Sequence, residues 1–140
     1  MHMNIKYHDM ETANAHDDGY AIIALMYIEV DNPNLMYDMI TDHLHNVQDI
    51  GQQYTFETPI YVESLLPPNR DEFYRYFGSY TTPRCNEAVT WIIYPEPVFI
   101  DKKQMKKFRT LYTTAFDIRT GHLKRMVGNI RHLQDIGNIQ

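Results

Sequence analysis

Cysteine, long apolar runs and basic charge are all scarce in this 140-residue sequence. Because Cys85 is the only cysteine, no disulfide forms within the chain and no cysteine-based metal cluster can be built. The longest apolar run, residues 21–28, is far too short to span a membrane. Basic residues number 13 against 18 acidic ones, and their one dense patch, residues 102–107, is typical of a solvated helix face. Nucleic acid is therefore not an expected partner.

Leader, linker and common catalytic motifs are also absent. The chain begins without the basic and apolar segments of a signal peptide, so we expect either that it stays where it is made or that its true N-terminus lies upstream. It contains no G-x-S-x-G, no H-E-x-x-H and no Gly-rich phosphate loop. No repeat or Gly/Ser-rich linker divides residues 1–140, which we treat as one domain.

The apolar segments that are present predict a strand-rich core. Residues 20–28 are almost continuously apolar and partly β-branched, which is typical of a central strand covered on both faces. Four further segments have weaker strand character: residues 54–62 (interrupted by Pro59), 88–94, 98–100 and 123–127.

Two helices are predicted between these strands. Apolar residues recur at helical spacing from Leu35 to Val47, and Gly51 is a plausible stop. Asp101 followed by Gln104 forms a capping-box pattern at the start of the second helix. Short helices around a strand-rich core indicate an α+β fold dominated by sheet.

The seven histidines do not form an evident metal site. His43 and His45 make an H-x-H pair, but their segment has helical periodicity, and residues two apart on a helix point in divergent directions. A zinc site needs three or four converging donors. A small metal protein built on His43 and His45 remains an alternative, and it would require stoichiometric zinc binding.

Residues 79–91, with the sequence SYTTPRCNEAVTW, form the most informative motif. The motif resembles the active-site signature of the α-carbonic anhydrases, in which S-L-T-T-P-P precedes a glutamate and a V-T-W strand. Further landmarks of that family occur in the same order along the whole chain: N-I-K-Y at 4–7, D-G-Y-A-I-I at 18–23, N-P at 32–33, L-L-P at 65–67, F-R at 108–109 and N-I-R-H-L-Q at 129–134.

The resemblance implies zinc-dependent, reversible hydration of carbon dioxide to bicarbonate. It also implies a fold that is part of a large, twisted, mostly antiparallel sheet with short flanking helices. Thr81 corresponds to the catalytic threonine that accepts a hydrogen bond from the zinc-bound hydroxide, and Thr82 to a neighbour at the pocket mouth. The apolar wall that holds carbon dioxide corresponds to Ile22, Tyr80, Val89 and Trp91, and an apolar surface suits this nonpolar substrate.

The departures from the family pattern are equally specific. The three zinc histidines of the family, and the glutamate that partners its threonine, would all lie upstream of Met1, while His2 matches a later, structural histidine. We therefore expect zinc in a longer parent protein and none bound by this chain, which alone would be inactive. Tyr80 replaces leucine and is expected to narrow access to the pocket, and Arg84 replaces the second proline.

Cys85 matches a cysteine that secreted members of the family bond to one near their N-terminus, so the parent is expected to be extracellular. A catalytically silent, carbonic-anhydrase-related binding module is the alternative. The two hypotheses differ in whether three zinc histidines lie upstream.

Overall fold

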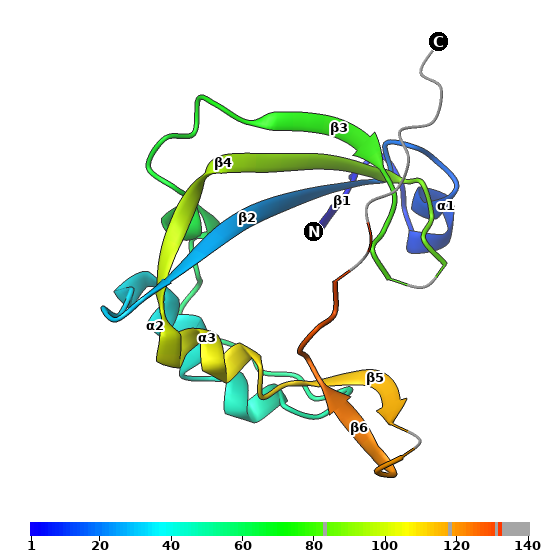
Figure 1. The fold of residues 1–140 in the computed structure, drawn as a ribbon. Coiled ribbons are helices and arrows are strands. Elements are labelled where there is room, and N and C mark those ends of the chain that lie inside the picture. Colours follow the sequence, from blue (N-terminus) through cyan, green and yellow to red (C-terminus); the bar gives the residue numbers. More distant parts are fainter. Residues whose placement is uncertain (83, 118, 131, 133–140) are drawn as a thin grey trace.

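The computed structural model describes residues 1–82, 84–117, 119–130 and 132. Short helices and two sheets make up the described part of the chain (Figure 1). The elements, in chain order, are β1 (His2–Met3), α1 (Met10–Asn14), β2 (Tyr20–Val30), α2 (Leu35–Thr41), the 3₁₀ turns Leu44–Val47 and Val62–Leu65, β3 (Tyr74–Gly78), β4 (Val89–Asp101), α3 (Lys102–Phe108), β5 (Tyr112–Asp117) and β6 (His122–Arg125). This is the sheet-dominated fold, with few and short helices, that the sequence predicts.

The main sheet has the strand order β1-β2-β4-β3. Its two long strands, β2 and β4, run parallel, from the pair Tyr20–Val89 to the pair Val30–Asp101. The outer strands β1 and β3 are antiparallel to their neighbours, and β5 pairs with β6 as a separate antiparallel hairpin. The pairing of the described strands is thus mixed: three strand pairs are antiparallel, and the long central pair is parallel.

Strand β4 corrects one prediction. Residues 98–100 form no separate third strand, because the strand continues from Val89 to Asp101 through Pro95 and Pro97. The register shifts between Leu25 and Tyr27 of β2, opposite this proline-containing stretch. A proline has no N–H to give to the ladder, so an irregularity here lets the strand continue past both prolines.

Three other differences between sequence and structure concern element boundaries. Residues 54–61 are not a strand, and the 3₁₀ turn Val62–Leu65 follows them; the interruption at Pro59 outweighed the aromatic content. The helix that begins at Leu35 ends at Thr41, well before Val47, and Gly51, with a φ of +84°, sits in a later turn. Four elements were not predicted from the sequence: β1, α1, β3 and β5, which are short and only partly apolar.

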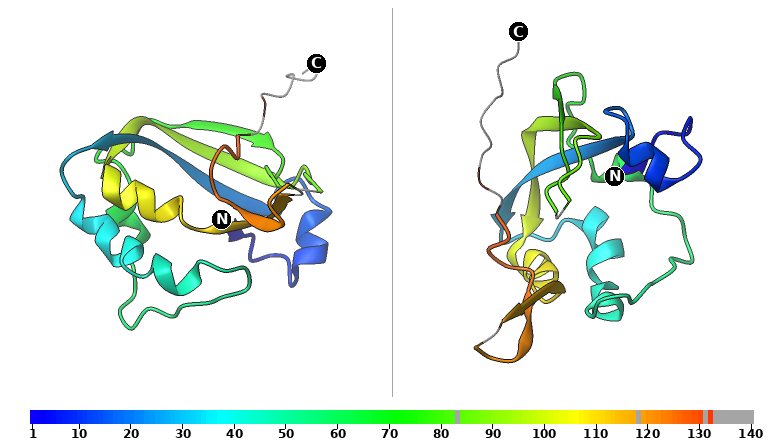
Figure 2. Two further views of the ribbon diagram at one scale, coloured as in Figure 1. Left: turned by 60° about the horizontal axis from the view of Figure 1, so that its bottom comes forward. Right: turned by 90° about the vertical axis from the view of Figure 1, so that its right-hand side faces the viewer.

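Two hydrophobic clusters lie at opposite ends of the sheet. Helices α2 and α3 lie side by side under one end (Figure 2), where Tyr37, Val98 and Ile100 are buried together. At the other end, near α1, Tyr20, Ala88 and Val89 are buried. The predicted site residues belong to this second end.

The main sheet leaves several large apolar side chains open to solvent. Large apolar side chains are exposed on three strands, among them Ile28 (45%) on β2, Tyr74 (67%) and Phe77 (64%) on β3, and Phe99 (55%) on β4. No helix among the described residues has the length and apolar character needed to cross a membrane.

Candidate functional site

Four predicted site residues come together at one end of the sheet, and we call this group, Ile22, Tyr80, Val89 and Trp91, the apolar wall. Ile22 of β2 pairs in register with Trp91 of β4, and two residues earlier on each strand Tyr20 pairs with Val89. Because alternate residues of a strand share a face, Ile22, Val89 and Trp91 lie on the same side of the sheet. Val89 is fully buried, and Ile22, Tyr80 and Trp91 pack against its cluster.

Aromatic neighbours hold this wall in place. The ring of Tyr80 meets the ring of Tyr20 edge-on, with centroids 5.2 Å apart. The ring of Tyr76, on β3, stacks on the indole of Trp91 at 6.3 Å. Sequence reasoning missed Tyr20 and Tyr76, although their period-two spacing from Ile22 and Gly78 was a usable signal.

The glycine at position 78 has little room around it where the wall meets β3. A Cβ built on Gly78 would lie 3.0 Å from Cε2 of Tyr76 and 3.2 Å from Cδ1 of Trp91. A larger residue at position 78 would therefore require the Tyr76 ring or the Trp91 indole to shift by a few tenths of an ångström.

Burial gives Tyr80 an electrostatic signature. Its side chain is partly buried, and desolvation, followed by the influence of the neighbouring Tyr20 hydroxyl, raises the pKa of the Tyr80 phenol above its ordinary value. A phenol is already neutral at physiological pH, and the raised pKa only extends its neutral range, so Tyr80 adds no charge to the wall.

The loop that joins β3 to β4, residues 79–88, carries both threonines, and we call it the threonine loop. The indole Nε1–H of Trp91 donates to the carbonyl oxygen of Ser79 at 3.1 Å. Across the loop, the Tyr80 N–H donates to the Asn86 carbonyl at 3.0 Å. Thr81 and Thr82 are exposed beyond these bonds. The loop is thus fixed at its base against Trp91 and presents its two threonines to solvent beside the apolar wall.

The histidines within the described residues do not converge on one point. No group of three His, Cys, Asp or Glu side chains within the described residues is arranged to hold a metal ion. His43 stacks on Tyr54 with ring centroids 4.5 Å apart, and His45 is an exposed residue of the 3₁₀ turn Leu44–Val47. His2 is exposed on β1, where its Nδ1 lies 2.9 Å from the Met3 carbonyl oxygen. The described residues therefore do not form a zinc site by themselves.

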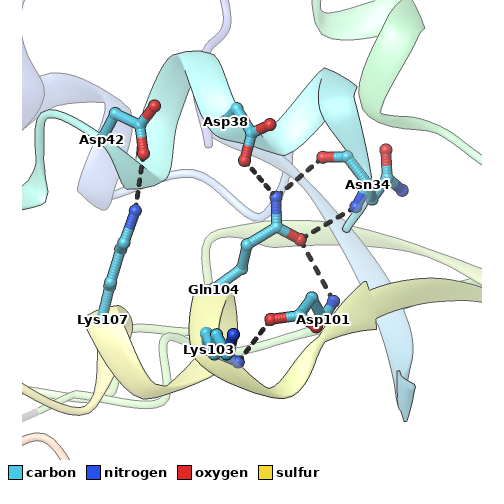
Figure 3. Close-up of polar contacts among 7 residues, drawn as sticks. All are labelled: Asn34, Asp38, Asp42, Asp101, Lys103, Gln104 and Lys107. Atoms are coloured by element: carbon cyan, nitrogen blue, oxygen red, sulfur yellow. Dashed lines mark hydrogen bonds and ion pairs between the residues drawn. The ribbon is translucent and has the colours of Figure 1, made fainter. Parts of the chain in front are cut away.

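A second polar cluster, far from the wall, joins the starts of α2 and α3 (Figure 3). Gln104 is buried, and its Nε2 donates to the Asn34 carbonyl at 2.9 Å and to Oδ1 of Asp38 at 2.5 Å. Its Oε1 accepts from the backbone N–H groups of Asn34 and Asp101, each at 3.1 Å. This completes the capping box predicted from Asp101 and Gln104. All four hydrogen bonds of the Gln104 amide are made within the fold, so this cluster joins two helices and leaves no amide group of Gln104 for a ligand.

Comparison with known proteins identifies the family of this chain. The sequence model for eukaryotic-type carbonic anhydrases matches residues 1–140, the full length of the chain. The chain belongs to the α-carbonic anhydrase family. Human carbonic anhydrase 12 is 38% identical over 129 residues, which cover 91% of this chain and 35% of that protein. Mouse carbonic anhydrase 15 is 33% identical over 143 residues, covering 98% of this chain and 42% of that protein.

Pig carbonic anhydrase 3 is 32% identical over 115 residues, covering 82% of this chain and 43% of that protein. The chain thus spans less than half the length of these carbonic anhydrase relatives. The activity of a complete carbonic anhydrase comes to this chain only as a proposal.

Proposed function

We propose that this chain supplies the substrate wall and the threonine loop of a carbonic anhydrase that interconverts carbon dioxide and bicarbonate. The observation that carries the proposal is the convergence of Ile22, Tyr80 and Trp91 around buried Val89, with the threonine loop bonded to the Trp91 indole. Membership of the family supplies the reaction class, and this arrangement supplies the residues.

Each residue then has a distinct task. The apolar wall holds carbon dioxide, which has neither net charge nor dipole, and excludes water from around it. Thr81 is the catalytic residue, with its hydroxyl group orienting the attacking oxygen and its backbone N–H facing a substrate oxygen. Thr82 lines the mouth of the pocket.

Zinc belongs to the complete protein in this proposal. It would be held by three histidines upstream of Met1 and would supply the nucleophile at neutral pH, as metal ions do in hydratases. Because the chain spans less than half the length of its carbonic anhydrase relatives, we propose that residues 1–140 are a partial domain that is inactive alone.

Cys85 bears on the cellular compartment of the parent protein. Its thiol is exposed and unpaired with any other cysteine in the chain. We propose that it forms a disulfide with a cysteine upstream of Met1, in an extracellular parent protein.

The test is the activity and zinc content of the protein expressed with its own upstream coding sequence. We expect one zinc per molecule and carbon dioxide hydration, with Thr81→Ala lowering kcat about 10²-fold, the usual cost of losing one group that stabilises the transition state. Thr114→Ala is the matched control, because Thr114 is exposed on β5, and it should leave the rate unchanged. A folded protein without zinc and without activity would instead identify a silent binding module.

A further inference from the structure

Two tyrosines meet at the apolar wall, one inside the fold and one nearer its surface. Tyr20, the first residue of β2, is only 2% exposed. Tyr80, in the threonine loop, is partly buried and packs against the buried cluster that contains Tyr20. Their rings meet edge-on at an interplanar angle of 61°, a favourable arrangement for an aromatic pair. Tyr80 is therefore the outer ring of the pair and Tyr20 the inner one.

The inner ring is fixed from two directions. The Tyr20 N–H donates to the Ala88 carbonyl at 2.9 Å, next to the point where Tyr20 pairs with Val89 of β4. The Tyr20 hydroxyl donates to the carbonyl of Met10, the first residue of α1, at 3.2 Å. Tyr20 is thus attached to β4 by its backbone and to α1 by its side chain, and it cannot turn aside without breaking one of these bonds.

The outer ring rests on the inner one. The backbone of Tyr80 is held by the bond from its N–H to the Asn86 carbonyl, which leaves the direction of the ring to side-chain packing. Protein interiors are close-packed, so the Tyr80 ring cannot move deeper into the cluster while the Tyr20 ring occupies that space. The position of the Tyr80 ring therefore depends on Tyr20.

We propose that Tyr20 is a positioning residue, whose ring fills the space behind Tyr80 and keeps the Tyr80 ring at the surface of the apolar wall. Held there, Tyr80 narrows the approach of carbon dioxide. The effect on rate rests on the proposed function, whereas the packing of the two rings is a property of this chain. Tyr20 does not touch the substrate in this account and acts through Tyr80.

The experiment uses the protein expressed with its own upstream coding sequence, and it combines crystal structures with stopped-flow hydration. Tyr20→Leu leaves a space behind Tyr80, and side chains around such a space relax into it in part. The Tyr80 ring should therefore move inward in the crystal structure. The kcat/KM for carbon dioxide should rise severalfold through a lower KM, with kcat unchanged, because Thr81 is not affected.

Three further variants separate this role from general stability. Tyr20→Phe keeps the ring and should change neither the Tyr80 position nor kcat/KM. The double variant Tyr20→Leu/Tyr80→Leu should have the kcat/KM of Tyr80→Leu alone, because no ring remains at position 80 to be positioned. Tyr7→Leu is the matched control: Tyr7 belongs to the same buried cluster, but its ring stacks on His16. It should lower stability and leave kcat/KM unchanged.

Three results would overturn the proposal: a Tyr80 ring that stays in place in Tyr20→Leu, a Tyr80 ring that moves in Tyr20→Phe, or rate gains that multiply in the double variant. If Tyr20→Leu does not fold, the structures of the unchanged protein and of Tyr20→Phe still decide, because a Tyr80 ring away from residue 20 in either would contradict the proposal. The ring positions need no hydration activity. An inactive parent protein would therefore refute the proposed function and leave the positioning of Tyr80 by Tyr20 standing.

Discussion

Tyr80 is the residue at which this chain departs most directly from the wall of its family. The resemblance places leucine at this position, and tyrosine is bulkier. Here the ring packs edge-on against Tyr20 and joins the cluster around Val89, so it is part of the wall. The wall residues were predicted from the family resemblance alone, and period-two alternation on β2 and β4 explains why Ile22, Val89 and Trp91 share a face. The sequence carried no signal for the positive φ of Arg84, +83°, because the residue types that mark positive φ are mainly glycine, asparagine and aspartate.

Tyr80→Leu in the zinc-binding parent protein should raise kcat/KM for carbon dioxide severalfold, because the smaller side chain widens access to the wall. Stopped-flow hydration measures this directly. Tyr74→Leu is the matched control, since Tyr74 is 67% exposed on β3, and it should have no effect. An unchanged rate for Tyr80→Leu would show that Tyr80 does not restrict the pocket.

Among the secondary structure elements, helices α2 and α3 are held together by the side-chain amide of Gln104. Gln104 donates to Asn34 and Asp38 and accepts from Asn34 and Asp101, so its four bonds fix the start of both helices. A nearby ion pair between Lys107 and Asp42, at 2.5 Å, is exposed and contributes little.

Gln104→Glu should lower the free energy of unfolding by about 2–4 kcal/mol at pH 7, because a buried carboxylate loses both donations and faces Asp38. Urea denaturation of the protein expressed with its own upstream coding sequence measures the loss. Burial is expected to raise the pKa of the carboxyl introduced at position 104. The loss in free energy of unfolding should therefore shrink as the pH falls and this carboxyl is protonated. Gln53→Glu, at an exposed position, should stay within about 0.5 kcal/mol of the unchanged chain. An equal loss in both variants would contradict the structural role of Gln104.

The sequence predicted these elements unevenly, for physical reasons. The capping box and β2 were found because each has a strong local signal: a cap residue with its partner three positions on, and a long apolar run. The continuation of β4 past Pro95 and Pro97 was missed because it depends on the register shift opposite β2. The strand β3 was missed because its residues are exposed and paired only with β4.

The whole molecule exposes more apolar sheet than an isolated domain usually does. Large side chains of β2, β3 and β4 are open to solvent, and β3 is a sheet edge within the described residues. Open edges and apolar faces favour association between chains.

We therefore expect the isolated 140-residue chain to be poorly soluble or unstable and to associate in sedimentation experiments. A Tyr74→Lys/Phe77→Lys double variant should reduce the association, because lysine on an edge strand opposes pairing. Ile5→Lys is the control, since Ile5 is 94% exposed and lies outside the sheet. A sharp, reversible thermal transition in a monomeric sample of the unchanged chain would contradict the expectation.

The central claim, that this chain is the wall and threonine loop of a zinc hydratase, is tested most directly by sequencing its transcript upstream of Met1. The claim predicts an open reading frame that continues into E-x-H-x immediately before Met1, with an H-x-H segment earlier, which supplies the three zinc histidines. An in-frame stop codon before Met1, or an upstream segment in which these histidines are replaced, would contradict it and would favour a silent binding module.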